Sequence, residues 1–191
     1  MIVVSEEPLT TINYQLTTNN FADMVYIGAI ILFLTALVQS VVLPQAVPIS
    51  ARPHFVVLLV VAVCIAESLY EAVIWGFIGG LMLDLLSGPA FPIGTNALIL
   101  VLLALLASMG QADPFHNLLL VPLVTVFIAT VFYHVLMMGV SLALGHDVAL
   151  LDNMLRVALP GAVLNAILMP VAYSAILWLS ERVGRRVRVE W

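Results

Sequence analysis

The sequence predicts an all-α integral membrane protein, a bundle of six transmembrane helices with almost no water-soluble part. Of its 191 residues, 63% are hydrophobic and 9% are charged, and the mean hydropathy is +1.17. Soluble domains carry about 25% charged and roughly 45–50% apolar residues. The apolar residues also fall into long runs, separated by short breaks rich in proline, glycine and polar residues. Together these observations indicate that lipid, not water, surrounds most of the chain.

The apolar runs set the expected helices. About 20 helical residues span the ~30 Å hydrocarbon core of a bilayer. The apolar stretch from Phe55 to Leu86 is too long for one crossing, so we interpret it as a hairpin that turns near Glu67 and Glu71. The six expected helices are residues 24–43, 54–67, 71–87, 95–110, 118–144 and 155–179.

The ends of the chain set its orientation. Residues 1–22 form a polar N-terminal extension, residues 23–182 the transmembrane domain and residues 183–191 a basic tail. Four of the six arginines lie between Arg182 and Arg188, directly after the last helix. Basic residues next to membrane helices stay in the cytoplasm. With an even number of helices, both termini are then expected to be cytoplasmic.

A stripe of small residues runs along the expected helix 71–87 and ends in an acid. Residues four apart lie on one helix face, and small residues there let another helix approach closely. We therefore expect this stripe to bind a partner helix. Its members are Ala72, Gly76, Gly80 and Asp84, with Gly79 beside them.

Asp84 is the main polar residue within this region, and its role is open between three readings. It could cap backbone amides of the loop that follows Ser87-Gly88-Pro89. It could instead face a cavity or partner and pair with a donor such as Arg156 or Asn165. A proton-relay role is the third reading. The residues expected to line the loop or cavity are Ser87, Gly88, Thr95, Asn96, Arg156 and Asn165.

The sequence shows no phosphate-binding loop, nucleophile elbow, metal-ligand spacing or basic nucleic-acid surface. Its single cysteine, Cys64, cannot form an intramolecular disulfide. We therefore expect a protein that packs against other helices and lipid, with no catalytic residues, cofactor, metal or bound nucleic acid.

The run from Trp75 to Asn96, WGFIGGLMLDLLSGPAFPIGTN, resembles the rod shape-determining membrane protein family MreD. The matching elements are Trp75-Gly76, Gly79-Gly80, the Asp84–Gly88 turn and Gly94-Thr95-Asn96-Ala97. The resemblance implies a non-enzymatic part of the bacterial cell-elongation machinery, in the cytoplasmic (inner) membrane. It implies binding to MreC and, indirectly, to MreB filaments and cell-wall synthases, and so a role in regulating peptidoglycan synthesis. It also implies a bundle similar to the S-components of ECF transporters.

Two main hypotheses follow from this resemblance. The first is a scaffold that docks the membrane helix of MreC on one face of the bundle. The second is a small-molecule-binding subunit like a transporter S-component, with an outward-facing cavity near Asp84 and residues 87–95. A membrane enzyme acting on lipid-linked cell-wall precursors is a more distant third. Self-association, lipid binding and the role of the N-terminal extension stay open.

Overall fold

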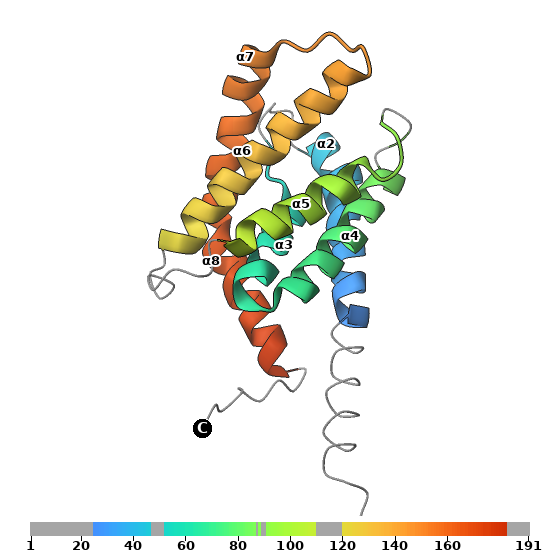
Figure 1. Cartoon of the computed structure of the whole chain (residues 1–191). Coiled ribbons are helices and arrows are strands. Elements are labelled where there is room, and N and C mark those ends of the chain that lie inside the picture. Colours follow the sequence, from blue (N-terminus) through green and yellow to red (C-terminus); the bar gives the residue numbers. More distant parts are fainter. Residues whose placement is uncertain (1–24, 47–51, 87, 89–90, 110–119, 183–191) are drawn as a thin grey trace, which may run out of the picture.

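The computed structural model describes residues 25–46, 52–86, 88, 91–109 and 120–182, and every regular element in these ranges is helical (Figure 1). The first helix is Val25–Gln45, and its last turns are a π-helical turn, Val38–Val42, and α2, Leu43–Ala46. The middle helices are α3 (Phe55–Ala66), α4 (Leu69–Leu86), α5 (Thr95–Met109) and α6 (Leu120–Ala143). A last continuous helix joins α7 (Leu150–Asn153), a π-helical turn (Met154–Ala158) and α8 (Leu159–Arg182). The predicted extension and basic tail lie outside the described residues.

Within the described parts of the chain, four helices are long and apolar enough to cross a membrane. These are Val25–Gln45, α4, α6 and the continuous helix Leu150–Arg182. By contrast, α3 has 12 residues and α5 has 15. At 1.5 Å per residue they are about 18 Å and 22 Å long, less than the ~30 Å hydrocarbon core. The described chain is thus an all-helical membrane protein with four candidate spans.

The short helix α3 occupies the centre of the bundle. Its sequence, FVVLLVVAVCIA, is apolar on every side, as expected for a helix that is surrounded by protein. Nine of its twelve residues are buried, and it contacts α4, α5, α6 and α8. The core of the molecule is therefore built around a helix that is too short to cross the bilayer alone.

The expected hairpin within residues 54–87 is present as α3 and α4, separated at Glu67 and Ser68. Glu71 fixes the start of α4, because its Oε2 accepts a hydrogen bond of 3.2 Å from the backbone N–H of Ser68. An acid at the third helical position that binds back to the capping residue is half of a capping box. Glu71 is only 2% exposed, so this acid belongs to the core.

The bundle has two ends, which are formed by different helix termini. Figure 1 shows the start of the first helix and the end of α8 at one end, and α2 and α7 at the other. At the first end, the Arg182 guanidinium lies 4.6 Å from the centre of the Trp178 ring. We call the opposite end, where α2 and α7 lie, the α2 end.

Candidate functional site

The small-residue stripe of α4 packs against α5 of the same chain. A methyl group added at Gly76 would meet the backbone carbonyl oxygen of Leu100 at 3.0 Å. One added at Gly80 would overlap the backbone of Ala97. Both glycines are buried. The prediction that this stripe is an open groove for a partner helix is therefore corrected, because α5 already fills it.

The other small residues of α4 are also internal. A methyl group at Gly79 would lie 2.9 Å from the side chain of Val56 and 3.1 Å from that of Leu32, so this glycine brings α4 close to α3 and the first helix. Ala72 is fully buried in the core. In a membrane, where lipid is as apolar as leucine, such close backbone approach is a main source of helix association.

Asp84 closes the α4–α5 seam, which we define as the packed interface along Gly76, Gly80 and Asp84. Oδ1 accepts hydrogen bonds from the backbone N–H of Asn96 (3.0 Å) and from Asn96 Nδ2 (2.9 Å). Oδ2 accepts from the backbone N–H of Gly94 (2.9 Å) and of Ala97 (3.2 Å). These amides belong to the first turn of α5 and the residue just before it, where a carboxylate is favoured. Asp84 therefore caps a helix from a neighbouring helix, as the capping reading predicts.

The alternative partners of Asp84 lie elsewhere. Arg156 is exposed and pairs with Asp152 at 2.5 Å. Asn165 is fully buried and bonds to other groups. The paired-charge reading of Asp84 is therefore wrong, and Arg156 is not among the lining residues of the pockets described below.

The predicted loop residues have local roles. Thr95 Oγ1 donates to the Pro92 carbonyl at 2.7 Å, which shapes the turn before α5. Gly88 is exposed and has a φ of 78°, in the left-handed region that glycine adopts without strain. Ser87 lies outside the described residues.

A second polar group ties α6 and α8 to the segment before α3. Asn165 Oδ1 accepts from the backbone N–H of His54 at 3.0 Å, and its Nδ2 donates to Thr130 Oγ1 at 2.9 Å. His134 Nδ1 lies 2.8 Å from the Thr130 carbonyl. The rings of His54 and His134 are 4.9 Å apart, and the rings of His54 and Tyr133 are 4.8 Å apart. Buried polar groups that satisfy one another in this way fix a single packing arrangement.

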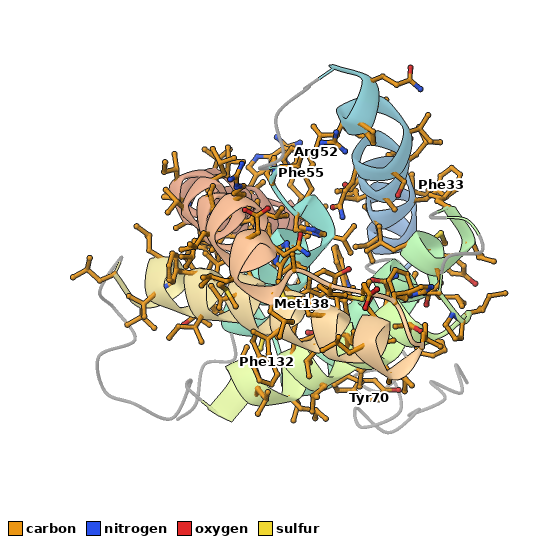
Figure 2. The ribbon with its side chains drawn as sticks, turned by 90° about the horizontal axis from the view of Figure 1, so that it is seen from above. Phe33, Arg52, Phe55, Tyr70, Phe132 and Met138 are labelled. Atoms are coloured by element: carbon orange, nitrogen blue, oxygen red, sulfur yellow. The ribbon has the colours of Figure 1, made fainter. Side chains whose placement is uncertain are left out.

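The two groups meet through Tyr133, whose hydroxyl donates to Asn96 Oδ1. Above them is a pocket of about 390 Å³ at the α2 end. We call it the end pocket. Figure 2 looks onto this end and shows Arg52 next to Phe55, between the first helix and α8. The pocket is lined by Gln39, Ser40, Leu43, Arg52, Pro53, His54, Leu83, Leu86, Phe91, Asn96, Tyr133 and Met137.

Two apolar grooves lie on the sides of the bundle. The first, of about 310 Å³, lies between the first helix and α3 and is lined by Leu34, Thr35, Val38, Phe55, Leu58 and Leu59. The second, of about 350 Å³, lies between α5 and α6 and is lined by Leu103, Leu106, Ala107, Thr125, Ile128, Ala129 and Phe132. We call them the first-helix groove and the α5–α6 groove.

The polar groups of the site hold the fold together. The Asp84 carboxylate and the Asn96 and Asn165 amides spend their hydrogen bonds on other parts of the fold. Among the described residues, no group of three or more His, Cys, Asp or Glu side chains could hold a metal ion. The arrangement can hold helices together and can offer a pocket and grooves to other molecules.

Of the predicted cavity residues that the structure describes, only Asn96 lines the end pocket. Four further residues line the end pocket and were not predicted as site residues from the sequence: Gln39, Arg52, His54 and Tyr133. The Arg-Pro-His run directly before an apolar helix was the available signal for two of them. The positions of Gln39 and Tyr133 depend on helix packing and carry no local sequence signal.

Comparison with known families agrees with the resemblance seen in the sequence. The family model of the rod shape-determining protein MreD matches residues 22–181. The comparisons with curated proteins and with solved structures found no match. The family match covers most of the chain and all of the helices described above except the last residue of α8. The chain therefore belongs to the MreD family of rod shape-determining membrane proteins.

Proposed function

We propose that the chain is a non-enzymatic scaffold of the bacterial rod complex, in the cytoplasmic membrane, which binds the membrane helix of MreC. Family membership implies a role in rod shape determination. Through MreC, the scaffold would act on the cell-wall synthases and the MreB filaments, and so on peptidoglycan synthesis. The observation that carries the proposal is the first-helix groove.

The groove has the chemistry of a helix-docking surface in lipid. All but one of its lining residues are apolar, and Thr35 spends its hydroxyl proton on the Ile31 carbonyl at 2.7 Å. Helices gain little from apolar contact alone in a bilayer, because lipid tails are equally apolar. They gain from close van der Waals packing, and a concave surface allows more of it than a flat one.

Two features favour this groove over the α5–α6 groove. The first helix is the least enclosed of the candidate spans, with 17% of its apolar window buried against 28–44% in the other three. It also contains the π-helical turn Val38–Val42, which begins at a groove residue. Such turns are frequent at functional sites. A partner helix would therefore add most burial here.

Site-directed photo-crosslinking tests the proposal. A photoreactive amino acid placed at Leu34 (56% exposed, in the first-helix groove) should crosslink to MreC in membranes. The matched control is Ile128 (60% exposed, in the α5–α6 groove), which should not. Crosslinking of MreC from Ile128 alone would move the partner to the other groove. Failure of the tagged wild-type chain to recover any MreC would refute the scaffold function.

The second candidate function is a small-molecule-binding subunit similar to a transporter S-component. The end pocket favours it, because aromatic and polar side chains from five parts of the chain converge there. Native mass spectrometry of the purified protein tests it. A tightly bound metabolite that survives exchange of the detergent would place this function first.

A further inference from the structure

The end pocket has an unusual balance of hydrogen-bonding groups. Among the residues that the structure describes, its lining contains one formally charged side chain, Arg52, and no aspartate or glutamate. Arg52 Nε is buried and has no hydrogen-bond partner among the described residues. A buried guanidinium donor without an acceptor is costly, and a bound acceptor would remove that cost.

The two amide oxygens of the pocket, on Gln39 and Asn96, are already occupied. Gln39 Oε1 accepts from the backbone N–H of Val56 at 3.0 Å. Asn96 Oδ1 accepts from Tyr133. Asp84 lies beneath Asn96, and four hydrogen bonds surround its carboxylate. The pocket therefore offers a ligand the Arg52 guanidinium as its charged group, and neither its amide oxygens nor the Asp84 carboxylate is free to bind a cation.

His54 adds a second donor. Gln39 Oε1 accepts a hydrogen bond from the backbone N–H of Val56. The other amide atom of Gln39, the donor Nε2, therefore faces His54 Nδ1 at 3.1 Å. His54 Nδ1 must then accept, and in a neutral ring the proton is on Nε2. Burial, and then the nearby His134, lower the pKa of His54 to about 3, so the ring is neutral at physiological pH. The structure gives Nε2 no partner in the part of the chain that it describes.

Apart from the Ser40 hydroxyl, the remaining walls are apolar. Leu83 and Leu86 come from the end of α4, Met137 comes from α6, and Phe91 comes from the turn before α5. A small inorganic anion would leave these walls uncovered. A ligand that joins an anionic head to an apolar body would cover both kinds of surface.

We propose that the end pocket binds the phosphate head of an anionic amphiphile, with Arg52 as the charged donor and His54 Nε2–H as the neutral one. Arginine is suited to phosphate because its guanidinium presents several donors in a planar fork. A phospholipid is the expected source, because part of the pocket wall comes from the last turns of a candidate membrane span, Val25–Gln45. The site differs from the groove assigned to MreC and shares none of its residues.

Lipid titration of the purified full-length protein in detergent, read by native mass spectrometry, tests the proposal. The probes are dioleoyl phosphatidylglycerol, dioleoyl phosphatidylcholine and inorganic phosphate. The wild-type protein should bind phosphatidylglycerol about tenfold or more tightly than phosphatidylcholine. Arg52→Gln should abolish that preference. Arg156→Gln is the matched control, because Arg156 is exposed and already paired with Asp152, and it should keep the preference.

The arms of the experiment separate the sources of the phosphate. Millimolar inorganic phosphate could displace phosphatidylglycerol from the wild-type protein but not from Arg52→Gln. This result would assign the site to a free anion and keep the proposed chemistry. Equal binding of the two lipids by the wild-type protein, without Arg52-dependent phosphate binding, would overturn the proposal. A preference that survives Arg52→Gln would also overturn it.

A second variant protects the test against misfolding. Met137→Trp fills the pocket from α6 and leaves Arg52 unchanged. It should remove the lipid preference while the melting temperature in phosphatidylcholine stays near that of the wild type. A well-folded Met137→Trp protein that keeps the full preference would place the lipid outside the pocket.

Discussion

The α4–α5 seam and the first helix show two ways in which this chain joins helices. The seam brings backbones together through Gly76 and Gly80 and is closed by the four hydrogen bonds to Asp84. The first helix packs through Gly28 against Trp75 and through Leu32 against Gly79. Near its end, Gln39 bonds to His54 and Val56. Most of its remaining surface is exposed. The comparison indicates a fixed interior and a side that is open to a partner.

The largest effect should come from filling the seam. Gly80→Ala places a methyl group inside the backbone of Ala97, which cannot move without separating α4 from α5. We expect a loss of about 3 kcal/mol or more in the free energy of unfolding, at the upper end of overpacking costs. Thermal unfolding in detergent measures it. Gly139→Ala is the control, because nothing lies within 4 Å of the added methyl and helix propensity favours alanine.

This result would also separate stability from partner binding. If the stripe were a partner groove, larger residues at Gly76 or Gly80 would weaken MreC binding and leave the protein folded. The packing of α5 predicts instead that Gly80→Leu lowers the amount of folded protein. A Gly80→Leu protein with normal abundance and unchanged melting would contradict the seam as described.

The next effect concerns the Asp84 cap. Each carboxylate oxygen accepts two hydrogen bonds from N–H donors, so Asp84→Asn would direct its amide NH₂ at two of them. Asparagine is a common helix cap, but this geometry predicts that the variant loses roughly 2–4 kcal/mol in the free energy of unfolding. Chemical or thermal unfolding of the variant measures it. A change below about 0.5 kcal/mol would show that the cap is not formed in the membrane.

The smallest effect should be a pH dependence of stability caused by His54, which bonds to Gln39 of the first helix. The pKa of His54 is lowered to about 3 from its ordinary value of 6.5. Between these values the unfolded state binds more protons than the folded state, so stability should fall as the pH falls from 6.5. Melting at pH 7.5 and at pH 5.5 measures the loss, and His54→Gln should reduce it. An unchanged pH dependence in His54→Gln would assign the effect to other groups.

The sequence was informative where one local pattern decides the outcome. Long apolar runs predict membrane helices, and the segments Asp84–Gly88 and Gly94–Ala97 carry the family resemblance. The cap formed by Asp84 was one of three readings that the sequence left open. The same sequence could not tell an internal small-residue stripe from an external one, because both need glycines four residues apart. Whether the stripe is internal depends on which helix packs against it. Here α5 packs against Gly80, and this tertiary contact leaves no local signal in the sequence.

The end pocket shows the same limit. Gln39, Arg52, Asn96 and Tyr133 come from four parts of the chain and line one pocket only in the folded bundle. An apolar run of 12 residues can be a membrane span's core or a buried central helix, and periodicity does not separate the two. The length and the central position of α3 therefore could not be predicted from the sequence and are known from the structure.

The central claim is that the chain is a scaffold whose first-helix groove holds MreC, and one paired measurement tests it most directly. Leu34→Trp and Ile128→Trp each fill one groove from an exposed position, so neither should disturb the core. At equal membrane levels, we predict that Leu34→Trp lowers the MreC recovered with the tagged chain about tenfold, the equivalent of roughly 1.4 kcal/mol, while Ile128→Trp leaves it unchanged. Equal recovery with both variants, or loss with Ile128→Trp alone, would contradict the account.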